Sequence, residues 1–316
     1  MFCSVIVPTI GREVLSRAVL SILQQTFSAE GVEVIVVNDS GQPLAKAAWQ
    51  DRENVQMVTT QRRERCFARN TGAAMAQGRY LIFLDDDDWL LPKALAHFWE
   101  LAHRQPEAVW LYGGIQVVDE QGACLAEVNS RLSGNCFAQI VGGAWAPIQA
   151  SMIQTQAFFA VGGYNPAIIG TEDLDLCRRL ALQGDFANTP APVACLFRGE
   201  TWDTSTNYLR APEDTLRSRD IVLNAPQAFR RLIRSADSSY WHGRILRVYL
   251  SLVRFHLRDR RLFKAASRAW FGFLGMMFAR LHVLAPTYWQ GAKADHPPQT
   301  LHFVMMALEQ QEKNKN

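Results

Sequence analysis

Short apolar runs alternate with helix-like segments along residues 1–113. Leu15, Val19 and Ile22 recur at the spacing of one helix face, and segments 66–77 and 92–104 show a similar pattern. The apolar runs are strand-sized and carry few polar residues on either face, which is typical of a parallel sheet covered by helices. The predicted strands are 3–8, 32–39, 55–60, 79–85 and 108–114.

Beyond residue 113 the pattern becomes less regular. Residues 114–150 hold several glycines and predict short mixed strands and loops. A helix is expected to begin after Thr171, which can cap it, with acidic residues in the first turn. Residues 186–198 predict a return to strand.

The stretch YLIFLDDDDW, residues 80–89, places four consecutive aspartates at the end of a buried strand. Two carboxylates 4 Å apart repel by about 4 kcal/mol at an effective dielectric of 20, so water, a cation or proton uptake must relieve them. In open parallel sheets ligands bind beyond the carboxyl ends of the strands, where Asp39 also falls. Oxygen ligands suit Mg²⁺ or Mn²⁺, and Mg²⁺ commonly shares its coordination with substrate phosphates. A solvated acidic turn before Pro92 is the simpler alternative.

Four stretches together carry a family resemblance: SVIVPTIGR, VIVVNDSG, ARNTGAAMAQGRYLIFLDDDDWLLP and GGYNPAIIGTEDLDLCRRLALQG. Their order and separations resemble the successive motifs of family 2 glycosyltransferases, over about residues 2–200. The resemblance implies an α/β fold of the GT-A type, with a mostly parallel sheet flanked by helices. It also implies an inverting transferase that takes its sugar from a nucleotide-diphosphate sugar.

The resemblance assigns roles to matching positions. Near the nucleotide it places Pro8, Thr9, Arg12 and Asp39, with Asp39 on the base, a uracil if the donor is UDP-linked. Near the diphosphate it places Arg69. In the DxD region it places Asp85 and Asp86, one of them on the ribose, and Asp87 on a Mg²⁺ or Mn²⁺ ion. Asp173 matches the catalytic base, with Glu172 and Asp175 as its neighbours.

This assignment agrees with the chemistry of sugar transfer. A departing nucleoside diphosphate gains negative charge, which a divalent cation stabilises as a Lewis acid. The acceptor hydroxyl needs a carboxylate to take its proton. Inversion requires the base to lie on the opposite side of the sugar from the diphosphate, so Asp173 and Asp87 should come from different parts of the chain. Many relatives carry a histidine after the last strand, whereas residues 196–206 here have none, leaving Arg198, Glu200 and Trp202 as candidates.

Two other functions use the same acidic cluster. A metal-dependent nucleotidyltransferase or phosphohydrolase would need no separate base such as Asp173, but would need a phosphate-gripping lysine or glycine-rich loop near the first strand. Residues 8–12 offer only one glycine and one arginine for that purpose. A non-catalytic nucleotide-sugar-binding protein is the other alternative.

The net charge of +3 conceals an uneven distribution. Residues 226–286 contain twelve Lys or Arg and two Asp, a local charge of +10, so the remainder carries −7. We therefore predict a catalytic domain over residues 1–215 and a basic, mainly helical segment over 216–316. Residues 243–263 predict a helix with five arginines within an arc of about 100°: Arg244, Arg247, Arg254, Arg258 and Arg261.

Two interpretations of the basic segment stay open: it lies on an anionic membrane surface, or it packs on the catalytic domain. The apolar run 269–279 is shorter than the roughly 20 residues that a membrane span needs. No nucleic-acid-binding module is recognisable, so we expect no nucleic-acid partner. The expected partners are a nucleotide-sugar donor and a saccharide or lipid-linked saccharide acceptor, as in cell-surface polysaccharide or lipopolysaccharide synthesis.

The six cysteines lack CxxC spacing, and the N-terminus enters a strand pattern without a signal-peptide pattern. Free thiols in a reducing cytosol are the expectation that follows. We therefore expect a cytoplasmic protein, with peripheral contact to the inner face of the cytoplasmic membrane as an extension of that prediction.

Overall fold

The fold is taken from a computed structural model that describes residues 1–27, 31–61, 64–197 and 211–294. The chain groups into two compact units. The first unit comprises Met1–Ser133, Ala146–Pro166 and Gln183–Asp203, and the second comprises Gly134–Trp145, Ala167–Leu182 and Thr204–Asn316. The chain thus passes between the units several times. The boundary that we placed at residue 215 stays a prediction.

A mixed nine-stranded sheet forms the centre of the first unit, in the order β3-β2-β1-β4-β8-β6-β9-β5, with β7 paired to β6. Strands β1, β2, β3 and β4 run parallel, as do β6 and β9, whereas β5, β7 and β8 pair antiparallel. The predicted strands are all present. The strands are β1 (Cys3–Thr9), β2 (Val32–Asn38), β3 (Val55–Thr59), β4 (Tyr80–Phe83), β5 (Trp89–Leu90), β6 (Trp110–Val118), β7 (Cys124–Val128), β8 (Ser151–Gln154) and β9 (Phe186–Phe197).

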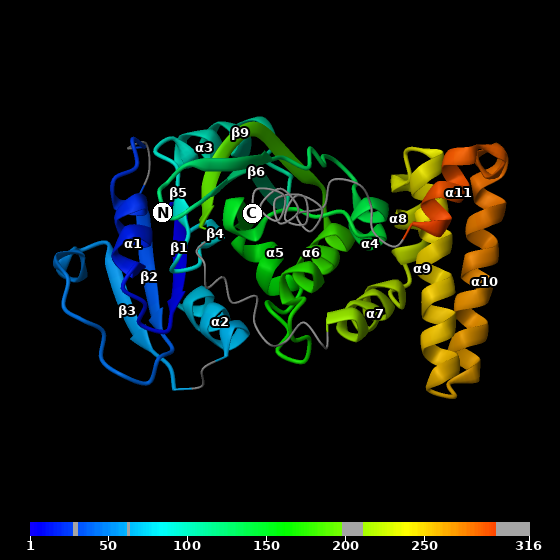
Figure 1. Ribbon diagram of the computed structural model, residues 1–316, viewed down its shortest axis with the longest axis horizontal. Coiled ribbons are helices and arrows are strands. Elements are labelled where there is room, and N and C mark those ends of the chain that lie inside the picture. The colour runs from blue at the N-terminus through cyan, green and yellow to red at the C-terminus, as the bar shows by residue number, and fades with distance from the viewer. Residues whose placement is uncertain (28–30, 62–63, 198–210, 295–316) are drawn as a thin grey trace, which may run out of the picture. The chain divides into compact units, whose positions relative to one another are not determined.

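Helices cover this sheet, as Figure 1 shows for the N-terminal half of the chain. Apolar residues line the faces of the helices that contact the sheet. In the helix over residues 15–23, for example, Ala18, Val19 and Ile22 are fully or almost fully buried. Burial of such side chains contributes roughly 25 cal/mol per Å² of apolar surface removed from water. The helical elements of the first unit are α1 (Leu15–Leu23), η1 (Ala48–Asp51), α2 (Arg65–Met75), α3 (Ala94–Arg104), η2 (Ile148–Ala150) and α5 (Thr155–Ala160).

Helix α2 packs closely against β1 and β2 because it presents a glycine there. A Cβ atom on Gly72 would lie 2.5 Å from Cγ2 of Ile6 and 3.0 Å from Cγ2 of Val37. Those separations are too short for a side chain, so the backbone of α2 approaches the sheet directly. This close approach brings the residues of α2 near the carboxyl end of β4.

The second unit is helical. Its longest helices, α9 and α10, pack side by side and connect through a short turn, as Figure 1 shows. The single helix predicted over 243–263 is wrong at its end, because α9 stops at Arg258 and Leu262 begins the next helix. The helical elements are α4 (Phe137–Gly142), α6 (Glu172–Gln183), α7 (Ala211–Leu223), α8 (Ala228–Ser235), α9 (Ser239–Arg258), α10 (Leu262–Ala279), η4 (Arg280–Leu284) and α11 (Pro286–Lys293).

The predicted arginine arc on α9 is interrupted in the folded protein. Arg244 is 1% exposed, and its guanidinium donates to the carbonyl oxygen of Gly142 through Nε and Nη2. Arg258 and Arg261, in contrast, are exposed. Arg244 therefore belongs to the core of the second unit, since an arginine with its donors satisfied can be buried. Within the described ranges, no helix is long and apolar enough to cross a membrane.

Candidate active site

The acidic run follows β4 at an edge of the sheet where β1 also ends. Ile6 of β1 pairs with Phe83 of β4, and the amide of Leu84 donates to the carbonyl of Ile6 at 3.0 Å. The chain then turns, with the amide of Asp88 donating to the carbonyl of Asp85 at 3.1 Å. The turn after Asp85, rather than strand alternation, therefore arranges the four carboxylates.

Thr9 and Arg12 meet this turn from the end of β1. The hydroxyl of Thr9 donates to Oδ2 of Asp86 at 2.6 Å. One guanidinium nitrogen of Arg12 lies 2.8 Å from Oδ1 of Asp86 and 2.6 Å from Oδ2 of Asp87. Gly11 makes the tight approach possible with φ of +88°, a conformation that glycine adopts without strain. Four of the predicted site residues thus form one hydrogen-bonded group.

Arg69 holds the first aspartate of the run. Its Nη2 donates to Oδ1 of Asp85 at 2.8 Å, and the guanidinium lies 5.1 Å from the ring centroid of Tyr164. Arg69 is 3% exposed, so this ion pair is shielded on the arginine side. Gln149, which the sequence analysis did not identify, donates to Oδ2 of Asp85 at 3.3 Å. Asp85 is therefore fixed from two directions.

Arg17 is a second contact that the sequence analysis missed. Its Nη2 donates to the carbonyl oxygen of Asp87 at 2.8 Å. The guanidinium stacks 4.0 Å from the ring centroid of Trp89 and 4.7 Å from that of Phe197. Asp88 is anchored nearby, because the amide of Phe197 donates to its Oδ1 at 3.0 Å. In the sequence, Arg17 is marked only by its position in the predicted helix after the first strand, five residues beyond Arg12.

Burial and mutual repulsion distinguish the four aspartates. Burial is the main cause that raises the pKa of Asp87, and repulsion from Asp85 is the second. The same two causes raise the pKa of Asp88 well above its ordinary value. Burial also raises the pKa of Asp86, although Thr9 and Arg12 oppose that rise. Asp85 behaves in the opposite way: burial raises its pKa, but Arg69, Arg65 and Gln149 together outweigh burial and lower it. The run is therefore short of positive charge beyond Asp85.

Asp39 lies at the end of β2, beside this group. Its amide donates to the carbonyl of Thr9 at 2.8 Å. Its carboxylate accepts the Thr60 hydroxyl and the amide of Glu64, the latter at 2.6 Å. Asp39 thus connects the ends of β1, β2 and β3 to the start of α2. Pro8 pairs with Val37 one position before the end of β1.

The acidic turn suits a hard divalent cation. Among the described residues, no three His, Cys, Asp or Glu side chains form a ready-made ligand set. Mg²⁺, however, usually takes one or two carboxylates and completes its shell with water and phosphate oxygens. Asp86 and Asp87 are two such carboxylates, they already share the cation of Arg12, and the Asp87 side chain is 32% exposed. Their raised pKa values indicate that more positive charge would be favourable there.

The predicted base lies on α6 in the second unit. Glu172 is 3% exposed, whereas Asp173 is partly exposed at the first turn of the helix. The amide of Ile169 donates to Oδ2 of Asp214 at 2.9 Å and anchors the segment before the helix. Thr171 does not cap the helix as we predicted, because its hydroxyl has no hydrogen-bond partner among the described residues. The position of Asp173 relative to the acidic run stays a prediction, and Arg198, Glu200 and Trp202 lie outside the described residues.

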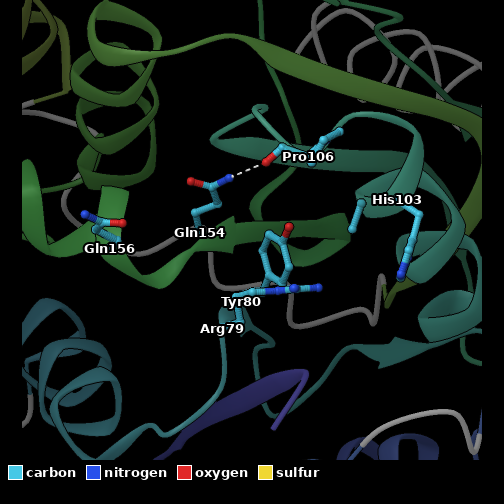
Figure 2. Close-up of a pocket in the computed structure, with 7 residues that line it drawn as sticks. Arg79, Tyr80, His103, Pro106, Gln154 and Gln156 are labelled. Atoms are coloured by element: carbon cyan, nitrogen blue, oxygen red, sulfur yellow. Dashed lines mark hydrogen bonds between the residues drawn. The ribbon is translucent and has the colours of Figure 1, made fainter.

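A separate hollow of about 330 Å³ lies at the other end of the sheet strands. Figure 2 shows Arg79 and Tyr80 at the start of β4, and Gln154 pointing toward Pro106. The side-chain amide of Gln154 donates a 2.9 Å hydrogen bond to the carbonyl oxygen of Pro106. None of the predicted site residues lines it. The candidate active site is therefore the carboxyl edge of β1, β2 and β4, as expected for ligand binding in an α/β sheet.

Comparison with known proteins agrees with this location. Residues 4–124 match the family model described as Glycosyl transferase family 2, and this range includes all the predicted site residues from Pro8 to Asp87. These residues are therefore similar to a glycosyltransferase family 2 domain. The other 195 residues of the chain lie outside the matched range.

Two curated relatives and one solved structure extend the comparison. An uncharacterized glycosyltransferase of Haemophilus influenzae is 24% identical over 212 residues, which cover 65% of this chain and 71% of the relative. A Campylobacter jejuni GalNAc(5)-diNAcBac-PP-undecaprenol beta-1,3-glucosyltransferase is 32% identical over 137 residues, or 41% of this chain and 40% of the relative. The structure of Staphylococcus aureus TarS 1–349 in complex with UDP-GlcNAc has a TM-score of 0.60 at 14% identity, covering 85% of this chain and 90% of that one. The structural likeness confirms the α/β fold with helices flanking a central sheet.

Proposed function

We propose that this protein transfers a sugar, with inversion, from a nucleotide-diphosphate sugar to a hydroxyl acceptor in the synthesis of a cell-surface glycan. The observation that carries the proposal is the convergence of Thr9, Arg12, Asp86 and Asp87 at the carboxyl edge of β1 and β4. The match of residues 4–124 to the family 2 model supports the same chemistry. A relative whose name describes a glucosyltransferase of an undecaprenol-linked glycan supports a saccharide or lipid-linked saccharide acceptor.

A UDP-linked donor is the proposed substrate. The structural neighbour was solved with UDP-GlcNAc, which makes a uridine nucleotide the first to test. Asp39 then receives the base, and Asp85, held by Arg69 and Gln149, or Asp86 receives the ribose. Arg69 lies near the diphosphate in this proposal, and Arg12, 2.6 Å from Asp87, supplies a further positive charge beside the nucleotide.

Asp87, with Asp86, would hold Mg²⁺ or Mn²⁺, which supplies Lewis-acid stabilisation of the departing diphosphate. Asp173 acts as the general base that takes the proton of the acceptor hydroxyl, and Glu172 lies beside it. The hydroxyl oxygen forms the new bond to the anomeric carbon as the bond to the diphosphate oxygen breaks. Displacement from the side opposite the diphosphate inverts the anomeric configuration.

A thermal-shift screen is the first test of the donor site. UDP, GDP, TDP and CMP and their sugar forms are added with and without Mn²⁺, since a ligand that binds the folded state raises the melting temperature. We expect a metal-dependent shift with the uridine series that Asp87→Ala abolishes. A shift with another series corrects the nucleotide. No shift with any of them, in a folded sample, contradicts the proposed donor site.

The Asp173→Asn variant tests the base. We expect transfer to fall by about 10²-fold to 10⁴-fold while the donor-induced thermal shift is kept. Asp51→Asn, an exposed aspartate in η1, is the matched control and should retain activity. Transfer that survives in Asp173→Asn would show that the base is another residue. Turnover of the nucleotide without an acceptor sugar would instead indicate a metal-dependent nucleotidyltransferase.

A further inference from the structure

Helix α10 has the reverse of the usual pattern of a water-facing helix. Its buried positions are mostly small residues, at Ala265, Gly272, Gly275 and Ala279. A Cβ atom on Gly272 would lie 3.2 Å from Cβ of Tyr249, so α9 and α10 approach closely through these small residues. Phe271, which stacks on Tyr249, and Met276 share this contact, whereas the other large apolar side chains of α10 lie mostly on the other side of the helix.

The outer face of α10 is apolar over about half of the helix circumference, at 100° per residue. Phe263 is 95% exposed and Trp270 is 58% exposed, although aromatic side chains of this size are normally buried. The only polar residue within this arc is Ser267. We define the α10 outer face as Leu262, Phe263, Trp270, Phe273, Met277 and Phe278, all of them exposed.

The charged residues of α10 lie off this face. Arg268 is buried, and its Nε donates to Oδ1 of Asp220 at 2.7 Å inside the second unit. Lys264, the other charged residue of α10, is exposed at the border of the apolar arc. An exposed apolar patch of this extent marks an interaction surface rather than ordinary exposed surface.

Positive charge flanks both ends of the outer face. Arg258 and Arg261 are 63% and 54% exposed before the first turn of α10, and Arg280 is exposed directly after its last turn. Asp259 is the only acidic residue between positions 238 and 294. It lies 3.6 Å from Arg258 and 3.5 Å from Arg261, and Glu213 of α7 also lies 3.6 Å from Arg258. Because Arg260, Lys264 and Arg280 add positive charge, the surroundings of the face stay cationic.

The charge distribution decides between the possible occupants. A second copy of this chain on the outer face would bring cationic ends against cationic ends in either a parallel or an antiparallel arrangement. A bilayer containing anionic lipids offers acyl chains to the apolar face and phosphate groups to the flanking cations. An 18-residue helix with a cationic residue at each end also has the form of a helix that lies in the interface plane.

We propose that α10 binds the surface of an anionic lipid bilayer, with its outer face inserted at the boundary between headgroups and acyl chains. Aromatic side chains such as Phe263 and Trp270 enter that boundary. Arg258, Arg261 and Arg280 contact lipid phosphates from its two ends. The protein then attaches to the membrane without a helix that spans it.

Vesicle co-sedimentation of the full-length protein tests the proposal. Vesicles of phosphatidylcholine alone are compared with vesicles that also contain phosphatidylglycerol. We expect binding to the anionic vesicles at least tenfold stronger than to the neutral ones, and weaker binding as salt is added. Equal binding to both, or binding to neither, contradicts the proposal.

Matched variants locate the contact. Phe273→Glu places a charge on the outer face and should weaken binding at least tenfold, whereas Phe159→Glu, equally exposed on α5, should not. The Arg261→Gln, Arg280→Gln double variant removes one proposed phosphate contact at each end of the outer face. It should lose most of the preference for anionic vesicles and keep the binding to neutral ones. Circular dichroism confirms that each variant is folded, as expected for exposed positions.

Sedimentation velocity distinguishes the second occupant. A wild-type dimer that Phe273→Glu converts to a monomer, without any binding to vesicles, would assign the outer face to self-association and overturn the proposal. A monomer that binds anionic vesicles supports it. Loss of vesicle binding in Phe159→Glu as well would place the membrane contact elsewhere on the protein and would also overturn it.

Discussion

The hydroxyl of Thr9 donates a 2.6 Å hydrogen bond to Oδ2 of Asp86, although 77 positions separate the two residues. Both residues are buried. Burial raises the pKa of Asp86, and the hydrogen bond from Thr9 opposes that rise because it stabilises the charged carboxylate. The end of β1 therefore helps to keep Asp86 ionised at the candidate active site.

Thr9→Val should raise the pKa of Asp86 further and weaken nucleotide binding. Removing a donor to a buried carboxylate costs about 1.5–3 kcal/mol of the free energy of unfolding. Urea denaturation measures this loss, and calorimetry measures the nucleotide affinity. Thr26→Val is the control, because Thr26 donates to the carbonyl of Pro92 at an exposed position and should leave nucleotide binding unchanged. Equal effects of the two variants would contradict the role of Thr9.

Arg69 and Asp85 should be energetically coupled. Arg69→Met removes the partner of a carboxylate that is then left partly buried, and it should cost about 1–3 kcal/mol in unfolding free energy. In the Asp85→Asn background the same change should cost less, since no charge remains to be compensated. A double-mutant cycle measured by denaturant unfolding gives the coupling, which should exceed about 0.5 kcal/mol. Additive losses would show that the ion pair contributes nothing.

Asp88 should make the protein less stable as the pH rises. Its folded-state pKa lies well above its ordinary value, mainly through burial and then Asp85 and Asp87. The folded state therefore binds the proton more tightly than the unfolded state, and the stability that this provides is lost as the pH rises through the raised pKa. Asp88→Asn cannot ionise and can still accept from the amide of Phe197.

The measurement is the unfolding free energy of wild type and Asp88→Asn from acidic to neutral pH. Relative to its value below the ordinary aspartate pKa, the difference should shift in favour of the asparagine variant as the pH rises. Adding Mg²⁺ and nucleotide to both proteins should reduce this advantage of the asparagine variant over wild type. A pH-independent difference would mean that the pKa of Asp88 is not raised.

Gly72→Ala should destabilise the protein by about 1–3 kcal/mol, because its Cβ would meet Ile6 and Val37 at the contact of α2 with the sheet. Gly275→Ala is the helical control: its Cβ would lie 3.6 Å from Ile245, an ordinary contact. Alanine favours helix over glycine by roughly 1 kcal/mol, so the control should be neutral or stabilising. Thermal unfolding of both variants checks the prediction, and a stable Gly72→Ala would show that α2 can shift from the sheet.

The α/β class and the strands around the candidate site could be predicted because they depend on local pattern. Apolar runs with helical segments between them indicated a covered sheet, and the carboxyl-end rule placed Asp39 and Asp85 at the same edge. The resemblance to family 2 glycosyltransferases then named Thr9 and Arg12 from their positions after the first strand. These inferences needed no knowledge of which side chains meet.

Only the tertiary structure decided the partners. The contacts of Arg17 with Asp87, and of Gln149 with Asp85, join positions 70 and 64 residues apart, and no local pattern specifies such pairs. Likewise, the sequence by itself identified an apolar run over residues 269–279 within a basic, mainly helical segment. Which face of that helix is outward depended on its small residues packing against α9, because burial is set by the neighbour that a face meets and not by its hydrophobicity alone.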